Sequence, residues 1–320
     1  MANERYSLYP SRFGDLLLRQ LAGLEVLPNG TKSEPIPGGA LDRGAVVTAF
    51  MEPVVRVRTI DFTGIFAGTP ACSITTGYLA DTTLGSPTAA TLLQYQARND
   101  GGTFKSGATD PINISSDKGF LYVEDISAEQ DSTDGAMISL LYAAMSINGV
   151  NPPLVAAMAS GGLTSTPTFN GIWYLGPVLI GTVGSGTAID GLRRISIRPG
   201  IEFRAKRQDG GPYPVIGSIH SRKPEITFGF ENAKQFYTRW PNIYGNLISG
   251  TSTQLAFYLQ KGADGGARVA AATTSHIRVL AALGDVSPDD FTVNGEDDAG
   301  FSVTMRPTTT LALTTGVAIA

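Results

Sequence analysis

Hydrophobic and polar residues alternate along several stretches of this 320-residue chain. In Arg194–Arg198, and again in residues 201–206, apolar side chains occupy every second position. A period of two is typical of a strand that buries one face. Further strands are predicted over residues 54–60, 91–96, 120–123, 137–144, 226–230 and 255–259. The sequence therefore predicts a mainly β fold.

Few stretches favour a helix. One is predicted from Arg12 to Ala22, where Leu16, Leu17 and Leu21 would lie on one side, and another from Glu231 to Trp240, closed by Pro241. Turns are better marked, because Asp-Gly-Gly follows strand-like residues at 100–102 and 209–211. We expect short helices beside a large content of strand and turn.

Stretches rich in Gly and Pro divide the chain into segments. Residues 1–45 contain Pro and Gly runs between 28 and 39, so they are interpreted as an N-terminal arm that packs on something else. Residues 46–160 then form a first β tube-like domain, and residues 190–320 form a second. Residues 151–192 are rich in Gly, Pro, Ser and Thr. Within them, residues 161–189 are interpreted as a linker with long loops.

The second half of the chain echoes the first. Residues 92–98 match 255–261 at a spacing of 163, and residues 119–139 match 284–304 at a spacing of 165. The drift falls at a turn, where single insertions are tolerated. A period this long predicts two related domains with the same strand order, with chance similarity as the alternative.

Composition limits the possible functions. Charged residues make up only 16%, while Gly numbers 38, which suits a protein largely covered by copies of itself. The net charge of −4 argues against broad binding to nucleic acid, which favours basic proteins. The single cysteine, Cys72, excludes an intrachain disulfide and fits a reducing cytoplasm. The first twenty residues resemble neither a signal peptide nor a membrane span.

Motifs for catalysis are missing. The two histidines, His220 and His276, have no zinc-type spacing, and we interpret both as surface or satisfied strand residues. Neither a nucleophile elbow nor a phosphate-binding Walker loop occurs. We therefore expect no enzyme, and we name no catalytic, cofactor-binding or metal-binding residue and no cofactor. A carbohydrate-binding module would need exposed aromatic residues; the candidates, better explained by core packing, are Trp173, Tyr174, Trp240 and Tyr244.

Charged residues gather in two places. The acidic group comprises Asp289, Asp290, Glu296, Asp297 and Asp298, interpreted as solvated turn residues, with a calcium site or a channel wall as alternatives. The basic group comprises Arg193, Arg194, Arg198, Arg204, Lys206 and Arg207. Apolar residues alternate with these cations, so we expect an outer strand face that pairs with acids of a neighbouring subunit rather than a nucleic-acid patch.

Several stretches together resemble tail proteins of tailed bacteriophages. They are GGALDR at 38–43, TIDF at 59–62, LLQYQARNDGGTFKSGA at 92–108 and GFLYVEDISAEQDSTDGA at 119–136. Residues 223–234, KPEITFGFENAK, are similar to the strand-then-helix stretch of phage tail tube proteins. The resemblance implies a β-sandwich or partial barrel in each domain, inner sheets that join between subunits, and loops and an arm that lock stacked rings.

The expected function is thus that of a virion protein, a tail tube subunit that is made in the host cytoplasm and forms rings around a channel for DNA. Another phage structural protein, such as a tail terminator, baseplate ring or capsid decoration protein, is the alternative. Tube proteins often have one domain and form hexamers; two domains here favour three subunits with pseudo-sixfold symmetry, with a hexamer as the alternative. We expect a net-negative channel wall that DNA passes without specific binding, contacts to other tail proteins, and no membrane partner.

Overall fold

The structure of the chain is a computed structural model. It describes all residues except 1–4, 28–31, 36–43, 48–51, 86, 99–110, 131, 159–170, 185, 190, 209, 231–247, 250–253, 264–265, 293–299 and 320. Strands account for 64% and helices for 4%, which confirms the prediction of a mainly β fold. The described part contains one α-helix, α1 (Phe62–Phe66), and one 3-10 helix, η1 (Thr82–Leu84).

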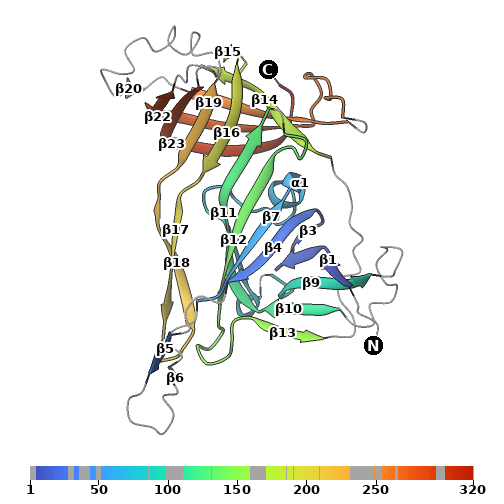
Figure 1. The fold of residues 1–320 in the computed structure, drawn as a ribbon, viewed down its shortest axis with the longest axis vertical. Helices are drawn as coiled ribbons and strands as arrows, with labels where there is room; N and C mark the ends of the chain where they lie inside the picture. Colours follow the sequence, from blue (N-terminus) through green and yellow to red (C-terminus); the bar gives the residue numbers. More distant parts are fainter. Residues whose placement is uncertain are drawn as a thin grey trace.

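One antiparallel sheet of 13 strands forms the body of the protein (Figure 1). Along its main path the order is β15 (Thr187–Ile189), β14 (Trp173–Ile180), β21 (Gln254–Lys261), β22 (His276–Thr292), β23 (Gly300–Val317), β19 (Glu225–Phe230), β16 (Leu192–Arg198), β11 (Lys118–Glu129), β12 (Met137–Met145), β7 (Val54–Thr59) and β4 (Leu21–Leu27). Off this path, β8 (Tyr78–Asp81) pairs with β11, and β20 (Ile248–Ser249) pairs with β22.

A second sheet packs against the lower part of the first. Its path is β13 (Val155–Met158), β10 (Ile112–Ser116), β9 (Thr91–Arg98), β2 (Ser11–Phe13) and β3 (Leu16–Leu18), and β1 (Arg5–Leu8) pairs with β9. Phe13 and Leu93 of this sheet share a buried core with Val57 and Leu140 of the large sheet. The lower part of the protein is therefore a two-layer sandwich.

Sequence alternation explains these layers. In β12 the residues Ile138, Leu140 and Tyr142 are fully buried, and the side chains between them are only half-buried. In β7, Val55 and Val57 are buried, while Arg56 and Arg58 lie on the opposite face. Because side chains alternate along a strand, each such strand covers the core with one face and leaves the other open.

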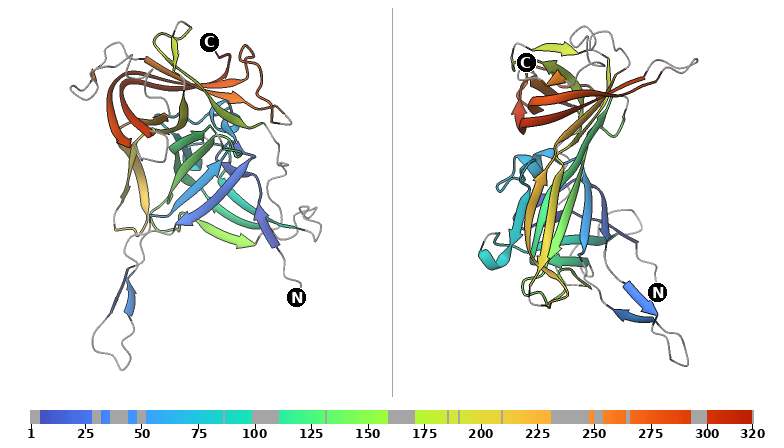
Figure 2. Two further views of the ribbon diagram at one scale, coloured as in Figure 1. Left: turned by 45° about the horizontal axis from the view of Figure 1, so that its top comes forward. Right: turned by 90° about the vertical axis from the view of Figure 1, so that its left-hand side faces the viewer.

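Two hairpins lie outside both sheets. The strands β17 (Ile201–Arg207) and β18 (Pro214–Arg222) continue β16 and β19 as a separate two-stranded ribbon. Gly200 makes the transition, with a φ of 61° and its backbone oxygen accepting from the amide of Lys223. The hairpin of β5 (Lys32–Pro35) and β6 (Gly44–Val47) projects from the lower end of the protein (Figures 1 and 2).

A four-stranded unit occurs twice within the large sheet. Its order is β4-β7-β12-β11 in the first half and β16-β19-β23-β22 in the second. In the first unit Leu27 of β4 lies opposite Val54 of β7. The equivalent pair in the second unit is Arg198 and Glu225, each 171 positions later in the chain. Both pairs of strands also have a register shift at the same place, between Leu21 and Gly23 in the first unit and between Leu192 and Arg194 in the second.

The other strands of the unit repeat in the same way. Ile126 of β11 lies opposite Ile138 of β12 in the first unit. The equivalent pair in the second unit is Phe291 and Phe301, which lie 165 and 163 positions later in the chain. The register shifts coincide again, between Val123 and Asp125 in the first unit and between Pro288 and Asp290 in the second. Tyr78 of β8 pairs with Leu121, and its counterpart Ile248 of β20 pairs with Val286. The two units agree in strand order and in register.

The two units are joined within one sheet. Two separate domains are not confirmed, because β11 of the first unit pairs directly with β16 of the second within one sheet. The expected match of residues 92–98 with 255–261 is wrong in structural terms. β9 lies in the smaller sheet, whereas β21 lies between β14 and β22 in the large one.

Two local predictions are also wrong. The helix expected from Arg12 to Ala22 is replaced by β2, β3 and the start of β4, and Phe13, Leu16 and Leu18 are buried in the core rather than held in a free arm. The segment expected as a linker at 161–189 includes β14, which pairs with β21, and β15. The predicted helix at 231–240 lies outside the described residues.

Candidate assembly surface

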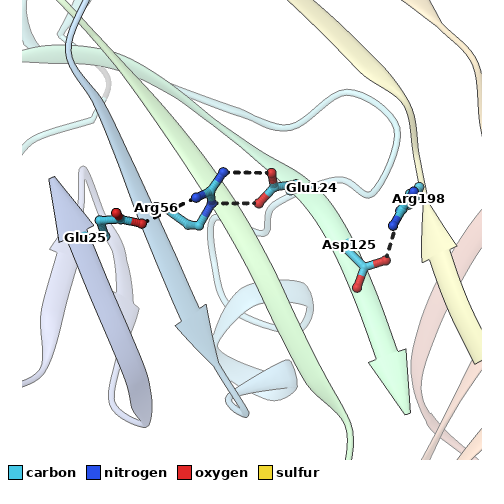
Figure 3. Close-up of polar contacts among 5 residues, drawn as sticks. All are labelled: Glu25, Arg56, Glu124, Asp125 and Arg198. Atoms are coloured by element: carbon cyan, nitrogen blue, oxygen red, sulfur yellow. Dashed lines mark hydrogen bonds and ion pairs between the residues drawn. The ribbon is translucent and has the colours of Figure 1, made fainter. Parts of the chain in front are cut away.

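The face of the large sheet that points away from the core carries a row of charged side chains. Arg56 on β7 makes a bidentate contact with Glu124 on β11, its Nε and Nη2 lying 3.1 and 3.2 Å from the two carboxylate oxygens (Figure 3). The Nη1 of Arg56 also lies 3.4 Å from Oε2 of Glu25 on β4. Three strands of the first unit are thus linked across their open face.

The row continues into the second unit. Arg198 on β16 places Nε 3.7 Å from Oδ1 of Asp125 on β11 (Figure 3), and the Ser196 hydroxyl donates to the same oxygen. Arg306 on β23 places Nε 3.7 Å from Oε2 of Glu225 on β19. We call these seven residues, Glu25, Arg56, Glu124, Asp125, Arg198, Glu225 and Arg306, the charged row.

The charged row is nearly balanced and open to solvent. It holds four carboxylates and three guanidiniums, so its formal charge is −1 per chain. The Glu124 carboxylate raises the pKa of Arg56, which keeps this guanidinium charged. Exposed ion pairs contribute roughly 0–1 kcal/mol each to folding. The row therefore makes the sheet face polar without making it a strong attractor for either sign of charge.

The seam between the two units buries aliphatic side chains on its core side. Ile126 pairs with Ile197, and Ala128 with Ile195, and all four side chains are buried beneath the sheet. Above them, Ser127 lies opposite Ser196 on the open face. A seam of this kind combines backbone hydrogen bonds, buried aliphatic contacts and a charge pair, and it holds the two units in one sheet.

The ribbon of β17 and β18 attaches to the sheet through aromatic rings. The ring of Phe203 stacks on that of Phe120, with centroids 4.7 Å apart and planes 15° apart, and Tyr122 lies beside them. A side chain at Gly217 would put its Cβ 1.9 Å from Phe203, so only glycine leaves room for this ring. A groove of about 800 Å³ lies where the ribbon leaves the sheet, lined in part by Pro199, Lys223 and Arg306.

The structure separates the basic residues that the sequence placed together. Arg198 pairs with Asp125 on the sheet, Arg204 with Glu202 on the ribbon at 2.6 Å, and Arg207 with Glu52 at 3.4 Å. Each of these three residues thus has an acidic partner within its own chain. Lys206 is exposed on the ribbon, and Arg193 and Arg194 are exposed on β16.

The acidic group cannot be placed in the same detail. Asp289 and Asp290 belong to β22, at the positions equivalent to Glu124 and Asp125 of the first unit. Glu296, Asp297 and Asp298 lie outside the described residues. The turn position expected for Asp289 and Asp290 is wrong, because both belong to a strand. The alternatives, a calcium site or a channel wall, stay predictions.

The histidines and tryptophans have ordinary structural environments. His276 is fully buried; its Nδ1 accepts from the amide of Lys261 at 3.1 Å, and its Nε2 donates to the carbonyl of Ala270 at 3.0 Å. His220 is exposed on β18. Trp173 is buried in the core, which confirms the packing interpretation for this residue, and Tyr174 is half-buried. Trp240 and Tyr244 lie outside the described residues.

The described part of the chain also bears on metal binding, thiol chemistry and membrane insertion. No group of three or more His, Cys, Asp or Glu side chains there could hold a metal ion. Cys72 is buried and unpaired with another cysteine, and burial raises the pKa of its thiol to about 12. Among the same residues, no helix has the length and apolar character needed to cross a membrane.

Sequence reasoning did not identify the charged row. The available signal was the alternation of Val55 and Val57 with Arg56 and Arg58, which assigns the arginines to an open sheet face. The partners Glu25 and Glu124 could not be found this way, because they come from strands whose pairing with β7 and β12 depends on long-range register.

No family model matches the chain, and no curated protein matches it significantly.

Proposed function

We propose that this protein is a structural subunit of a bacteriophage tail tube, in which copies assemble into stacked rings around a channel for DNA. The single observation that carries the proposal is the repeated four-stranded unit, whose two copies join edge to edge in one open sheet. A chain that already extends a sheet by adding an equivalent unit has the geometry needed to extend it further with additional chains. Sheet edges of this kind favour pairing unless they are covered.

The charged row suits the face of the channel. DNA binds basic surfaces through release of counterions, whereas passage requires a surface that does not hold it. A row with four carboxylates and three guanidiniums offers little net attraction to phosphate. Pairing of Arg56, Arg198 and Arg306 within the chain keeps these cations occupied. The charged row itself has a formal charge of −1, and Arg58 on the same face of β7 offsets it, so the proposed wall is close to neutral and has no sequence-specific contact with DNA.

The projecting hairpin of β5 and β6 suits a contact between rings. Its two strands pair only with each other among the described residues, and it extends beyond the sandwich (Figure 2). Leu27 and Val54, which flank the hairpin segment, are neighbours across β4 and β7. Residues 30–48 can therefore be replaced by a short Gly–Ser turn without opening the sheet. In the proposed tube, this replacement leaves ring formation intact and prevents stacking.

Negative-stain electron microscopy of the purified protein tests the proposal. The expected result is tubes for the full chain and single rings for the hairpin replacement. Monomers at every protein concentration would contradict any ring-forming role. Single rings from the full chain, with no tubes, would favour a tail terminator or baseplate ring instead.

A further inference from the structure

The seam between the two units shows how one unit accepts the next. β11 is covered along one edge by two strands in succession: β8 pairs with residues 118–121, and β16 pairs with residues 126–129. In the second unit β20 takes the place of β8 and pairs with Asp285 and Val286 of β22. No described strand covers the same edge of β22 at Phe291 and Thr292. In the described part of the chain, the position that corresponds to β16 is therefore open there.

The first unit has the complementary open edge. β4 is the counterpart of β16 and ends the path of the large sheet, and among the described strands it pairs only with β7. Ile195 and Ile197 of β16 are buried at the seam, with 3% and 1% of their surface exposed. Their counterparts on β4, Leu24 and Val26, pack against the same core but remain half-buried. The aliphatic face of β4 is thus incompletely buried, and a further strand beside β4 would cover it. The described part of a single chain does not supply that strand.

We propose that β22 of one copy pairs antiparallel with β4 of the next copy, in the register of the internal seam between β11 and β16. Phe291 replaces Ile126 and Val26 replaces Ile197, so Phe291 lies opposite Val26 of the next copy. Thr292 replaces Ser127 and Glu25 replaces Ser196, so Thr292 lies opposite Glu25 of the next copy. The proposal deepens the proposed function and rests on it, because it specifies the contact within each ring.

A contact of this kind can close into a ring. It joins two different edges, β22 of one copy and β4 of the other, and is therefore head-to-tail rather than a symmetric pairing of one edge with itself. In the large sheet β22 lies in the upper part of the molecule and β4 in the lower part (Figure 1). Each added copy leaves one edge of each kind open until the last copy meets the first. Closure then removes both open edges, which natural sheet proteins need to cover.

Cysteine cross-linking between copies tests the register. In a Cys72→Ala background, Glu25→Cys and Thr292→Cys are made in separate chains, which are mixed under assembly conditions and oxidised. The expected result is a covalent dimer from the mixture and none from either variant alone. Ala22→Cys mixed with Thr292→Cys is the negative control. Position 22 lies three residues, roughly 10 Å along the strand, from position 25, so its thiol is beyond disulfide reach of position 292. That mixture is expected to give no dimer.

The internal seam supplies a matched positive control. Ser127→Cys with Ser196→Cys in one chain places thiols at the equivalent positions, and oxidation is expected to remove both free thiols without raising the mass to that of a dimer. Rings or tubes that lack the link between positions 25 and 292, while this control links, would overturn the register and leave the proposed function standing. A protein that stays monomeric under all conditions would overturn both.

Discussion

The hydroxyl of Tyr142 joins the two layers of the sandwich, and its removal makes a quantitative test of the fold. Tyr142 on β12 is fully buried. It donates to Ser116 Oγ at 3.1 Å and accepts from Thr91 Oγ1 at 3.1 Å, and both partners belong to the smaller sheet. Thr91 in turn accepts from the amide of Gly14. Tyr142→Phe leaves the Thr91 hydroxyl without its acceptor, and a buried unsatisfied group costs about 1–3 kcal/mol.

The same residue predicts a distinct pH dependence. Burial raises the pKa of Tyr142 from 10.0 to about 12. Since the folded protein holds this proton more tightly than the unfolded chain, the stabilisation is complete below pH 10 and is lost as the pH rises toward 12. The loss is about 1.4 kcal/mol per pH unit in that window, and Tyr142→Phe lacks it. The stability difference between the two proteins should therefore shrink above pH 10.

Urea unfolding followed by far-UV circular dichroism, at several pH values between about 8 and about 11, measures this difference. Burial also raises the pKa of Cys72, but both proteins share that effect, so it cancels. Tyr174→Phe, at a half-buried tyrosine, is the matched control and should change stability by less than about 0.5 kcal/mol. A difference between wild type and Tyr142→Phe that stays constant across the whole pH range would refute the reasoning.

Three further substitutions test other contacts. Gly217→Ala displaces the Phe203 ring from its stack and should cost about 1–3 kcal/mol in urea unfolding, whereas Ser218→Ala on the exposed ribbon face should be neutral; equal effects would contradict the stacking account. His276→Leu leaves two backbone groups without partners and should lower stability by about 2–4 kcal/mol; an unchanged melting temperature would contradict this role. Arg56→Met should cost less than about 1 kcal/mol in urea unfolding, and a larger loss would show that the charged row is stronger than its exposure implies.

Strand content could be predicted from the sequence because alternation is a local signal. Residues 54–60 and 194–198 show the pattern and form β7 and β16. The stretch from Arg12 to Ala22 was misassigned because its three leucines also fit a helical spacing. Burial of Phe13, Leu16 and Leu18 in the sandwich decides for strands, and that burial depends on a second sheet which local sequence does not reveal.

Only part of the internal repeat could be found from the sequence. The spacing of 165 found for residues 119–127 is the one that the structure has between β11 and β22. For β12 and β23 the structural spacing is 163, because the chain between the last paired residues is two residues shorter in the hairpin of β22 and β23 than in that of β11 and β12. The sequence match of Gly135 with Gly300, at a spacing of 165, concealed this difference. The match of β4 with β16 went unnoticed, since strand register carries the equivalence and few identical residues do. The charged row depends on the same register and was missed for the same reason.

The mass of the assembled ring tests the central claim most directly. With two units in each chain, three copies supply six units, and a ring of three chains of 33.6 kDa has a mass of about 101 kDa. Mass photometry of the hairpin replacement, which should form rings without stacking them, measures this mass. The account predicts a dominant species of three variant chains, slightly lighter than that value because residues 30–48 are replaced by a shorter turn. A single species with the mass of one variant chain at every concentration would contradict it, and a ring of six variant chains would contradict the three-copy arrangement.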